Sequence, residues 1–322
     1  MYIFELMIAS SSMQSFIFWG IHMKRNLFLF GALFALTSAS VLSACGNSSG
    51  NTYKIIIAGM TANDERRRSI DFTDPYYQSE LVLVCQNDQS IDFDHVYNHE
   101  ELKTLLDGKI LVSQRGTITY TMIEEIFVPE FNCIAANAVD SFTTASILVS
   151  NNQAFAFTSE LPVALSYVNG SDGKLNILHI ENEILGEENL AELSVSIGIK
   201  KGNDEFLANL NSALNEISTS TRVDIMEKMV NFNANNNEPT DNIRDKYTGS
   251  NGKIIVGLEC NYPSFNWTET SENNYTYKIN GKSKEFAEGY DVEIAYLLAK
   301  SLDMTLEFEK MEWDALLSWA NL

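Results

Sequence analysis

The sequence is poor in cysteine, proline, histidine and basic side chains. Four cysteines among 322 residues are too few and too scattered for a disulfide-stapled scaffold or a zinc knuckle. Only 22 lysines and arginines accompany 43 acidic residues, which gives a formal net charge of -21. Because a phosphate backbone is repelled by such a charge, we expect no nucleic-acid partner. The one basic cluster, Arg66 to Arg68, is too short to form a nucleic-acid face.

Motifs that carry chemistry are also scarce. The sequence has no Ser-His-Asp or Cys-His arrangement and no glycine-rich phosphate loop. His95 and His99 have the i, i+4 spacing of helical metal ligands, but no third ligand accompanies them. We therefore expect neither a metal site nor a cofactor. Cys85, Cys133 and Cys260 are odd in number, and we expect them to be small buried apolar side chains.

The N-terminus has the pattern of an export signal. A basic pair at 24–25 precedes an apolar run over 27–42, which ends in the tetrad Leu42-Ser43-Ala44-Cys45. The tetrad resembles a bacterial lipobox, in which Cys45 becomes the first mature residue and carries lipid. We therefore interpret residues 1–45 as a lipoprotein signal peptide, of which 1–22 reflect a misplaced start codon. The alternative is an uncleaved anchor helix, and both place the bulk of the chain outside the cell membrane.

The remaining chain has the composition of a globular protein, with 45% hydrophobic residues. After a short polar tether at 46–51, β-branched runs alternate with helical patterns, which predicts an α/β fold. One Asn- and Asp-rich stretch, 233–251, interrupts the alternation and is typical of an exposed connector. The predicted strands lie near 54–58, 81–85, 109–113, 154–157, 195–199 and 253–258, and the predicted helices near 63–69, 98–106, 119–126, 204–217 and 222–230.

A turn at Gly59 carries the first binding chemistry. Thr61 followed by Asp64 is typical of a capping box that opens a helix. Backbone N–H groups at a helix start suit an anion, and Arg66 adds a bidentate clamp for a carboxylate. From these residues alone, a surface helix with a solvated arginine triplet remains the alternative.

The segment 58–66, followed by Ile70-Asp71-Phe72-Thr73-Asp74-Pro75-Tyr76-Tyr77, resembles the first-lobe signature of the polar amino-acid substrate-binding proteins of ABC importers. That family, the extracellular solute-binding proteins of family 3, folds as a type II periplasmic-binding-protein clamshell, an α/β fold with two lobes and a two-crossing hinge. Six further segments resemble the same family, and together the motifs span nearly all of 52–322. They are 114–119, 154–164, 198–203, 252–267, 289–295 and 311–317.

The resemblance implies partners for the two charged ends of an amino acid. The α-carboxylate meets Arg66, Thr61 and the backbone N–H groups around Thr117 and Ile118. The ammonium meets the Gly59 carbonyl and the Glu160 carboxylate. Because the family more often has aspartate at the position of Glu160, the longer side chain shifts the geometry there.

The resemblance also implies a pocket for the ligand side chain. Tyr262 and Trp313 form aromatic walls, and Glu259 reads the polar end. Two aromatic faces and an acid suit a cationic side chain, although they also accept an amide. The alternatives are that both aromatic residues belong to the core and that Glu259 is a rim acid turned to solvent.

The order of the motifs is unusual, because the family's opening block stands at the C-terminus of this chain. Joining the end of 252–322 to Asn51 restores the family's spacing, which predicts a circularly permuted single binding protein. The rival is a tandem protein whose second copy is truncated. We expect crossings near Leu83–Gln86 and Val195–Ile199, and 233–251 joins the old termini. Lobe 1 is predicted as 52–84, 198–232 and 252–322, and lobe 2 as 88–194.

The function implied by the resemblance is capture of a free polar amino acid and its delivery to an ABC permease and ATPase. We expect a monomer on the extracytoplasmic face of a bacterial cell membrane, anchored through lipid on Cys45. A sensor module is one alternative. An enzyme on the same scaffold, such as a dehydratase, is another, but it needs an acid and a base beyond Glu160 and Glu259.

Overall fold

The computed structural model describes residues 50–191, 193–235 and 247–321. The chain divides into two units, Met1–Asn47 and Ser48–Leu322, and the described residues belong to the second. The signal peptide with Cys45 and most of the tether lie outside the described residues, as does the middle of the predicted connector. Among the described residues, no helix is both long enough and apolar enough to cross a membrane. The second unit has the predicted α/β fold, with two lobes.

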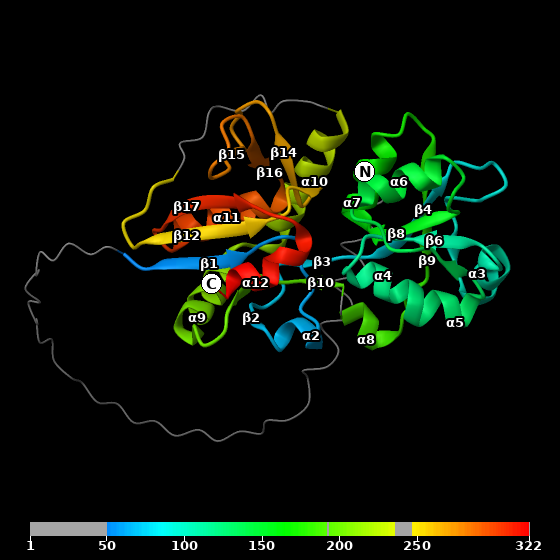
Figure 1. Ribbon diagram of the computed structural model, residues 1–322, viewed down its shortest axis with the longest axis horizontal. Helices are drawn as coiled ribbons and strands as arrows, with labels where there is room; N and C mark the ends of the chain where they lie inside the picture. Colours follow the sequence, from blue (N-terminus) through cyan, green and yellow to red (C-terminus); the bar gives the residue numbers. More distant parts are fainter. Residues whose placement is uncertain (1–49, 192, 236–246, 322) are drawn as a thin grey trace, which may run out of the picture. The chain divides into compact units, whose positions relative to one another are not determined.

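Lobe 1 is built on a five-stranded sheet that takes strands from distant parts of the chain. Its order is β17-β12-β1-β11-β2. The strands are β1 (Thr52–Ile56), β2 (Ile70–Phe72), β11 (Gly198–Lys200), β12 (Lys253–Leu258) and β17 (Thr305–Lys310). Figure 1 shows β12 lying between β1 and β17.

The centre of this sheet is parallel. β1 pairs with β12 from Thr52 opposite Lys253 to Ile56 opposite Gly257, and β12 pairs in parallel with β17. Ile55 and Ile56 are fully buried, as expected for a strand covered on both faces. The predicted pairing of 253–258 with 54–58 in one sheet is confirmed.

A second, four-stranded sheet in lobe 1 was not predicted from the sequence. It runs in the order β13-β14-β16-β15 and follows directly after β12 in the chain. Its strands are β13 (Asn261–Tyr262), β14 (Asn266–Glu269), β15 (Tyr277–Lys278) and β16 (Phe286–Glu288). The helix α11 (Tyr290–Ser301) begins immediately after β16.

Lobe 2 contains a six-stranded mixed sheet in the order β5-β9-β4-β8-β6-β7. The strands are β4 (Leu81–Gln86), β5 (Val96–Tyr97), β6 (Ile110–Val112), β7 (Ile134–Ala135), β8 (Ala156–Glu160) and β9 (Leu175–Ile180). Its helices include α3 (His99–Leu106), α4 (Ile118–Met122), α5 (Val128–Phe131), α6 (Phe142–Ser150) and α7 (Leu161–Asn169), with a π-helical turn η1 (Ile123–Phe127).

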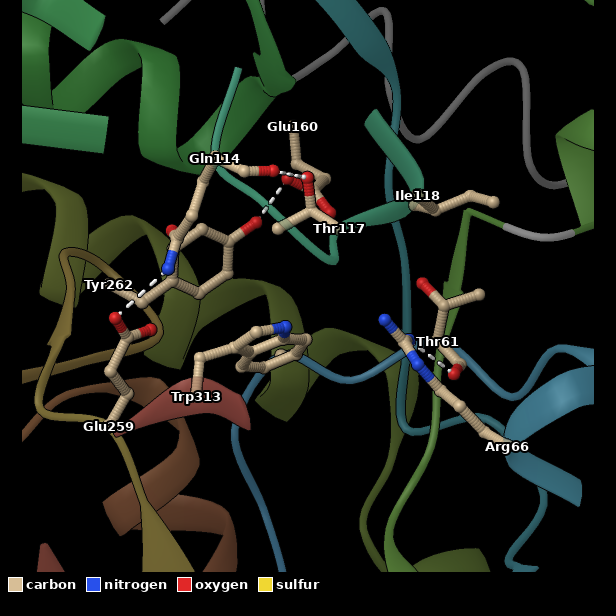
Figure 2. Close-up of a pocket in the computed structure, with 10 residues that line it drawn as sticks. Thr61, Arg66, Gln114, Thr117, Ile118, Glu160, Glu259, Tyr262 and Trp313 are labelled. Carbon is tan, nitrogen blue, oxygen red and sulfur yellow. Dashed lines mark hydrogen bonds between the residues drawn. The ribbon is translucent and has the colours of Figure 1, made fainter. Parts of the chain in front are cut away.

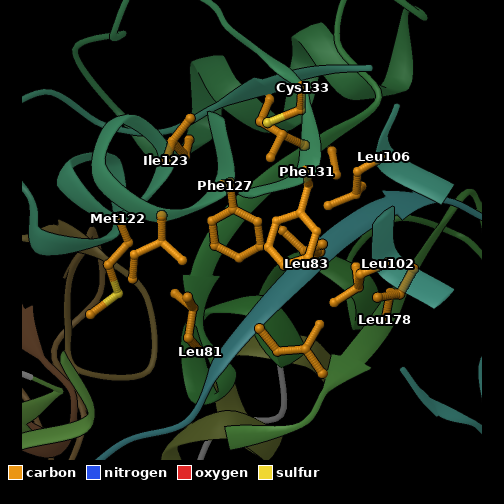
Figure 3. Close-up of a cluster of buried hydrophobic side chains, with 14 of the residues drawn as sticks. Leu81, Leu83, Leu102, Leu106, Met122, Ile123, Phe127, Phe131, Cys133 and Leu178 are labelled. Atoms are coloured by element: carbon orange, nitrogen blue, oxygen red, sulfur yellow. The ribbon is translucent and has the colours of Figure 1, made fainter. Parts of the chain in front are cut away.

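The core of lobe 2 forms where these helices cover the sheet. Phe127 and Phe131 are fully buried against Leu83 of β4 and Leu102 of α3 (Figure 3). Helix α3 buries Leu102 and Leu106, which are four residues apart and so share one face, and Asn98 begins the helix with a capping box that includes Glu101. Two of the cysteines predicted to be buried, Cys85 and Cys133, lie in this core, and the third, Cys260, is buried in lobe 1.

The first crossing between the lobes lies earlier than the sequence predicted. We expected lobe 1 to extend to residue 84, with a crossing near Leu83–Gln86. Strand β4 instead lies inside the lobe 2 sheet, between β8 and β9. The reason is that residues 81–85 are all buried, which is typical of a central strand and incompatible with an exposed hinge.

The observed hinge is a short two-stranded ribbon. β3 (Tyr77–Gln78) pairs in antiparallel fashion with β10 (Ser194–Val195), and the Ser79 N–H donates to the Leu193 carbonyl at 3.2 Å. Both crossings therefore run side by side. The predicted helices near 204–217 and 222–230 are α9 (Asp204–Glu216) and α10 (Thr219–Asn235). Helix α10 contacts α7 of lobe 2 as well as α11 of lobe 1.

Candidate ligand-binding site

The first wall of the site is the loop after β1. Gly59 has a φ of +61°, and a Cβ there would lie 2.5 Å from the ring of Tyr262. Glycine is therefore required both by the left-handed backbone and by the close aromatic ring. Thr61 is buried and forms an isolated bridge with Val195 of the hinge.

The helix after this loop is not capped by Thr61 as predicted. The N-cap of α2 (Asp64–Arg67) is Asn63, whose side chain accepts a hydrogen bond from the Arg66 N–H at 3.0 Å. Thr61 is unsuited to capping because it is paired with the hinge strand. The short helix nevertheless turns Arg66 inward, so that this side chain is 7% exposed, whereas Arg67 and Arg68 are exposed.

Arg66 links the two lobes. Its Nη1 donates to the Thr61 carbonyl at 2.8 Å, and its Nη2 donates to the Gly116 carbonyl of lobe 2 at 2.9 Å. The guanidinium carbon lies 5.3 Å from the ring centroid of Trp313, within cation–π range. The Trp313 Nε1 also donates to the Gly116 carbonyl, at 3.2 Å. The surface-helix alternative for Arg66 is therefore wrong.

The opposite wall is the lobe 2 loop that leads into α4. Thr117 is the N-cap of α4, and its Oγ1 accepts from the Tyr120 N–H at 3.3 Å. The same hydroxyl donates to the Gln114 carbonyl at 2.7 Å. Gly116 has a φ of +72°, and a Cβ there would lie 3.2 Å from the Trp313 Nε1. The loop thus fits closely against lobe 1.

A buried acid and a buried phenol meet across the lobes. Glu160, at the end of β8, is 4% exposed, and the Tyr262 hydroxyl donates a hydrogen bond to it. Burial raises the pKa of Glu160, while the hydrogen bond from Tyr262 and the charge of Arg66 oppose that rise. The Tyr262 ring stacks on Phe265 with centroids 5.3 Å apart.

A second buried acid lies on the other side of the site. Glu259 is 7% exposed, and its Oε1 accepts from the Gln114 Nε2 of lobe 2 at 3.0 Å. The pKa of Glu259 is raised to about 7, and burial is the largest cause. The hydrogen bond from Gln114 acts in the opposite direction, whereas the negative charges of Glu312 and Asp314 add to the rise. The alternative of a solvent-facing rim acid is therefore wrong.

All nine residues proposed as ligand contacts from the sequence line one pocket. Figure 2 shows Trp313 between Arg66 on one side and Glu259 on the other. The cavity between the side chains measures about 10 Å³, the room that one water molecule needs. The lining residues are Gly59, Thr61, Arg66, Gln114, Thr117, Ile118, Glu160, Glu259, Tyr262 and Trp313.

Gln114 is the lining residue that the sequence reasoning missed. It belongs to the segment 114–119 that carried the resemblance, but we assigned it no role. A signal was present, because Gln114 is polar and follows the buried strand β6 at its carboxyl end. Ligands of open α/β sheets bind outside that end of the strands.

Comparison with known proteins gives a family match over more than half of the chain. The model for bacterial extracellular solute-binding proteins, family 3, matches residues 38–231. A probable histidine-binding protein of Campylobacter jejuni subsp. jejuni serotype O:2 is 30% identical over 125 residues, which cover 37% of this chain and 45% of that protein. The match therefore spans less than half the length of this relative.

Solved structures of amino-acid-binding proteins are also similar. One is the amino acid ABC transporter substrate-binding protein AbpA from Streptococcus pneumoniae Canada MDR_19A bound to L-arginine. Its TM-score is 0.44 at 20% identity, and the match covers 56% of this chain and 67% of that one. An ancestral arginine-binding protein bound to glutamine has a TM-score of 0.41 at 28% identity, with coverages of 54% and 69%.

Proposed function

Because the chain belongs to the bacterial extracellular solute-binding proteins of family 3, we propose that it captures a free polar amino acid between its lobes for delivery to an ABC importer. The observation that carries this proposal is the combination of charges in one pocket. A guanidinium from lobe 1, Arg66, and a carboxyl from lobe 2, Glu160, both line it and both are buried. These are the two charges that an amino-acid zwitterion requires once water is excluded.

In this proposal the α-carboxylate of the ligand binds Arg66, the Thr61 hydroxyl and backbone N–H groups around Thr117 and Ile118. The bidentate geometry of guanidinium suits a carboxylate. The ammonium binds Glu160 and the Gly59 carbonyl. Burial supports these assignments, since a charge removed from water is stable only when a partner replaces the solvent.

The ligand side chain is proposed to lie between Tyr262 and Trp313, with its polar end at Glu259. Glu312 and Asp314 add negative charge near Glu259, which supports a cationic side chain. An amide side chain is equally compatible with the Gln114–Glu259 pair, because that pair offers both a donor and an acceptor. We therefore propose a cationic or amide amino acid.

Binding is proposed to require motion of the lobes about the β3–β10 ribbon. The cavity has room for about one water molecule, which is too little for an amino acid. Contacts that cross between the lobes, such as Arg66 to Gly116 and Gln114 to Glu259, must therefore part to admit the ligand. Hinge closure then re-forms the walls around it, as two-lobed proteins do without making or breaking covalent bonds.

A thermal-shift screen of the twenty amino acids tests this function. We expect one or a few polar amino acids to raise the melting temperature, because a ligand that binds only the folded state stabilises it. Each hit is then incubated with the protein and analysed by mass spectrometry. Recovery of the unchanged amino acid supports a binding protein, whereas conversion to a product would favour an enzyme.

We also propose that the protein is a lipoprotein held at the extracytoplasmic face of the membrane through Cys45. The tetrad at 42–45 and the apolar run before it support this. Mass spectrometry of the mature protein should find that it begins at Cys45 and that this cysteine carries lipid. An unmodified Cys45 that is still preceded by the apolar run would favour the uncleaved anchor.

Finally, we propose that the chain is a circularly permuted single binding protein. The family match ends at residue 231, and β12 and β17, which lie beyond it, complete the sheet that contains β1. Glu259, Tyr262 and Trp313 from that C-terminal part line one pocket with Thr61 and Arg66. In a truncated tandem protein, residues 252–322 would instead be expected to begin a second site of their own.

A further inference from the structure

A fully buried carboxylate lies behind the pocket without lining it. Asp291 is the second residue of α11 and is 0% exposed. Its Oδ1 accepts from the Tyr76 hydroxyl at 2.6 Å, and its Oδ2 accepts from the Asn266 Nδ2 at 2.8 Å. A buried carboxylate is costly unless its oxygens are hydrogen-bonded, and here each oxygen has a donor.

Asn266 connects this carboxylate to the loop that carries Glu259 and Tyr262. Asn266 is fully buried, and its Oδ1 accepts from the Cys260 N–H at 2.8 Å. Cys260 has a φ of +55°. Residues other than glycine adopt this left-handed backbone conformation only when the surrounding structure imposes it. The hydrogen bond that the Cys260 N–H donates to Asn266 is such a constraint.

The backbone of α11 fixes the far end of the same loop. The N–H groups of Tyr290 and Asp291 donate to the carbonyls of Ser264 and Phe265, both at 2.9 Å. Ser264 also has a positive φ, +70°. The loop between β12 and β14 is therefore held at two left-handed positions by the first turn of α11.

The second ligand loop of lobe 1 contacts the same carboxylate. The backbone of Gly59 lies near enough to the Asp291 carboxylate and to the Tyr76 hydroxyl to lower the pKa of both groups. Gly59 in turn lies against the Tyr262 ring. One carboxylate thus reaches the loop after β1 and, through Asn266, the loop after β12.

We propose that Asp291 is a positioning residue that fixes the Gly59 loop and the Glu259–Tyr262 loop relative to each other, and that amino-acid affinity depends on it although it does not line the pocket. The inference rests on the proposed function for its effect on affinity, but not for its effect on the two loops. Tyr76 and Asn266 both donate hydrogen bonds to the Asp291 carboxylate, and an amide in its place offers one acceptor oxygen to these two donors.

The variant Asp291→Asn tests this directly. Hydrogen exchange followed by NMR should find the amides of Gly59 and Cys260 exchanging at least about ten-fold faster, while amides of the lobe 2 core, such as Leu83, keep their rates. Calorimetry with L-arginine and L-glutamine as probes should find a loss of affinity of about ten-fold or more for whichever probe binds the parent protein.

A matched control and a rescue separate positioning from general stability. Glu288, on β16, is 2% exposed, and its carboxylate accepts from the Asn273 Nδ2 at 3.1 Å, so Glu288→Gln should leave both readouts unchanged. The double variant Asp291→Asn, Asn266→Asp restores a donor–acceptor pair. It should return amide exchange and affinity to within about three-fold of the parent.

If Asp291→Asn does not fold, Tyr76→Phe, which removes one donor and keeps the ring, and the double variant carry the test. Unchanged exchange at Gly59 and Cys260 would overturn the proposal, as would a double variant no better than Asp291→Asn. Failure of both probes to bind the parent protein would count against the proposed function alone, because the exchange rates decide the role of Asp291 without any ligand.

Discussion

Arg66 is the only buried member of its arginine triplet, and burial gives it a different role from its neighbours. Its charge faces a pocket from which water is largely excluded, whereas Arg68 is exposed. If Arg66 binds a ligand carboxylate, the ion pair is therefore buried. Removing the arginine then leaves the ligand carboxylate without a compensating charge.

We accordingly expect Arg66→Ala to weaken amino-acid binding by two to three orders of magnitude. Removing one partner of a buried charge pair costs about 3–5 kcal/mol, and each 1.4 kcal/mol is about ten-fold in affinity. Calorimetry measures the change, with Arg68→Ala as the control that should stay within a few-fold of the parent. If Arg68→Ala weakened binding strongly and Arg66→Ala did not, Arg66 would not be the carboxylate anchor.

Glu259 gives the binding site a pH dependence. Its pKa is raised to about 7, so the carboxyl is mostly neutral at pH 6 and mostly ionised at pH 8. The affinity for a cationic amino acid such as L-arginine should therefore rise by up to about ten-fold between these values. In Glu259→Gln the rise should disappear, and for L-glutamine it should be absent in both proteins. An equal rise in the variant would show that another group titrates.

Helix α2 is short, so its cap matters for the arginine that it carries. Asn63→Ala should lower the free energy of unfolding by about 1 kcal/mol and should also weaken amino-acid binding a few-fold, because Arg66 is less fixed. Asn98→Ala removes the cap of α3 in lobe 2, away from the pocket. It should cost similar stability, measured by thermal denaturation, without a loss of affinity. Equal affinity losses would indicate a global effect.

The elements differed in how well the sequence predicted them. β1, β12, α3 and α9 were predictable because their apolar periodicity or buried β-branched runs are continuous. The four-stranded sheet that follows β12 was not, because its strands are two to four residues long and depend on Asn266 and α11 for their conformation. Such tertiary constraints leave no periodic pattern.

The same distinction applies to the pocket. Gly59, Thr61 and Arg66 were first proposed from the turn and the helix start that follows it, whereas the other six predicted residues came only from the family resemblance. Periodicity alone located none of the nine. Gln114 was missed because its importance depends on contact with Glu259, which lies 145 positions away in the chain. The cap at Asn63 was misplaced for a similar reason, since only the bridge between Thr61 and the hinge removes Thr61 from that role.

The arrangement of the whole chain can be tested by cutting and by reordering it. A chain that ends at Ser250 lacks β12, β17, Glu259, Tyr262 and Trp313, and we expect it to lose amino-acid binding. A chain in which 252–322 precedes 51–250 should fold and bind within a few-fold of the parent, because permutation is tolerated where the joined ends lie close. Full affinity of the shortened chain would support the truncated tandem arrangement instead.

The parallel pairing of Thr52 with Lys253 and of Lys253 with Thr305 also bears on how the protein reaches its native state. Lobe 2 is continuous from β4 to β9, whereas the centre of lobe 1 joins strands from far apart in the chain, and such non-local pairing forms slowly. We therefore expect lobe 2 to become structured first. The edge of β1 stays unpaired until β12 folds against it. Pulse-labelling hydrogen exchange during refolding should find amides of β4 and β8 protected before those of β1. Until then the unpaired edge of β1 is open to aggregation.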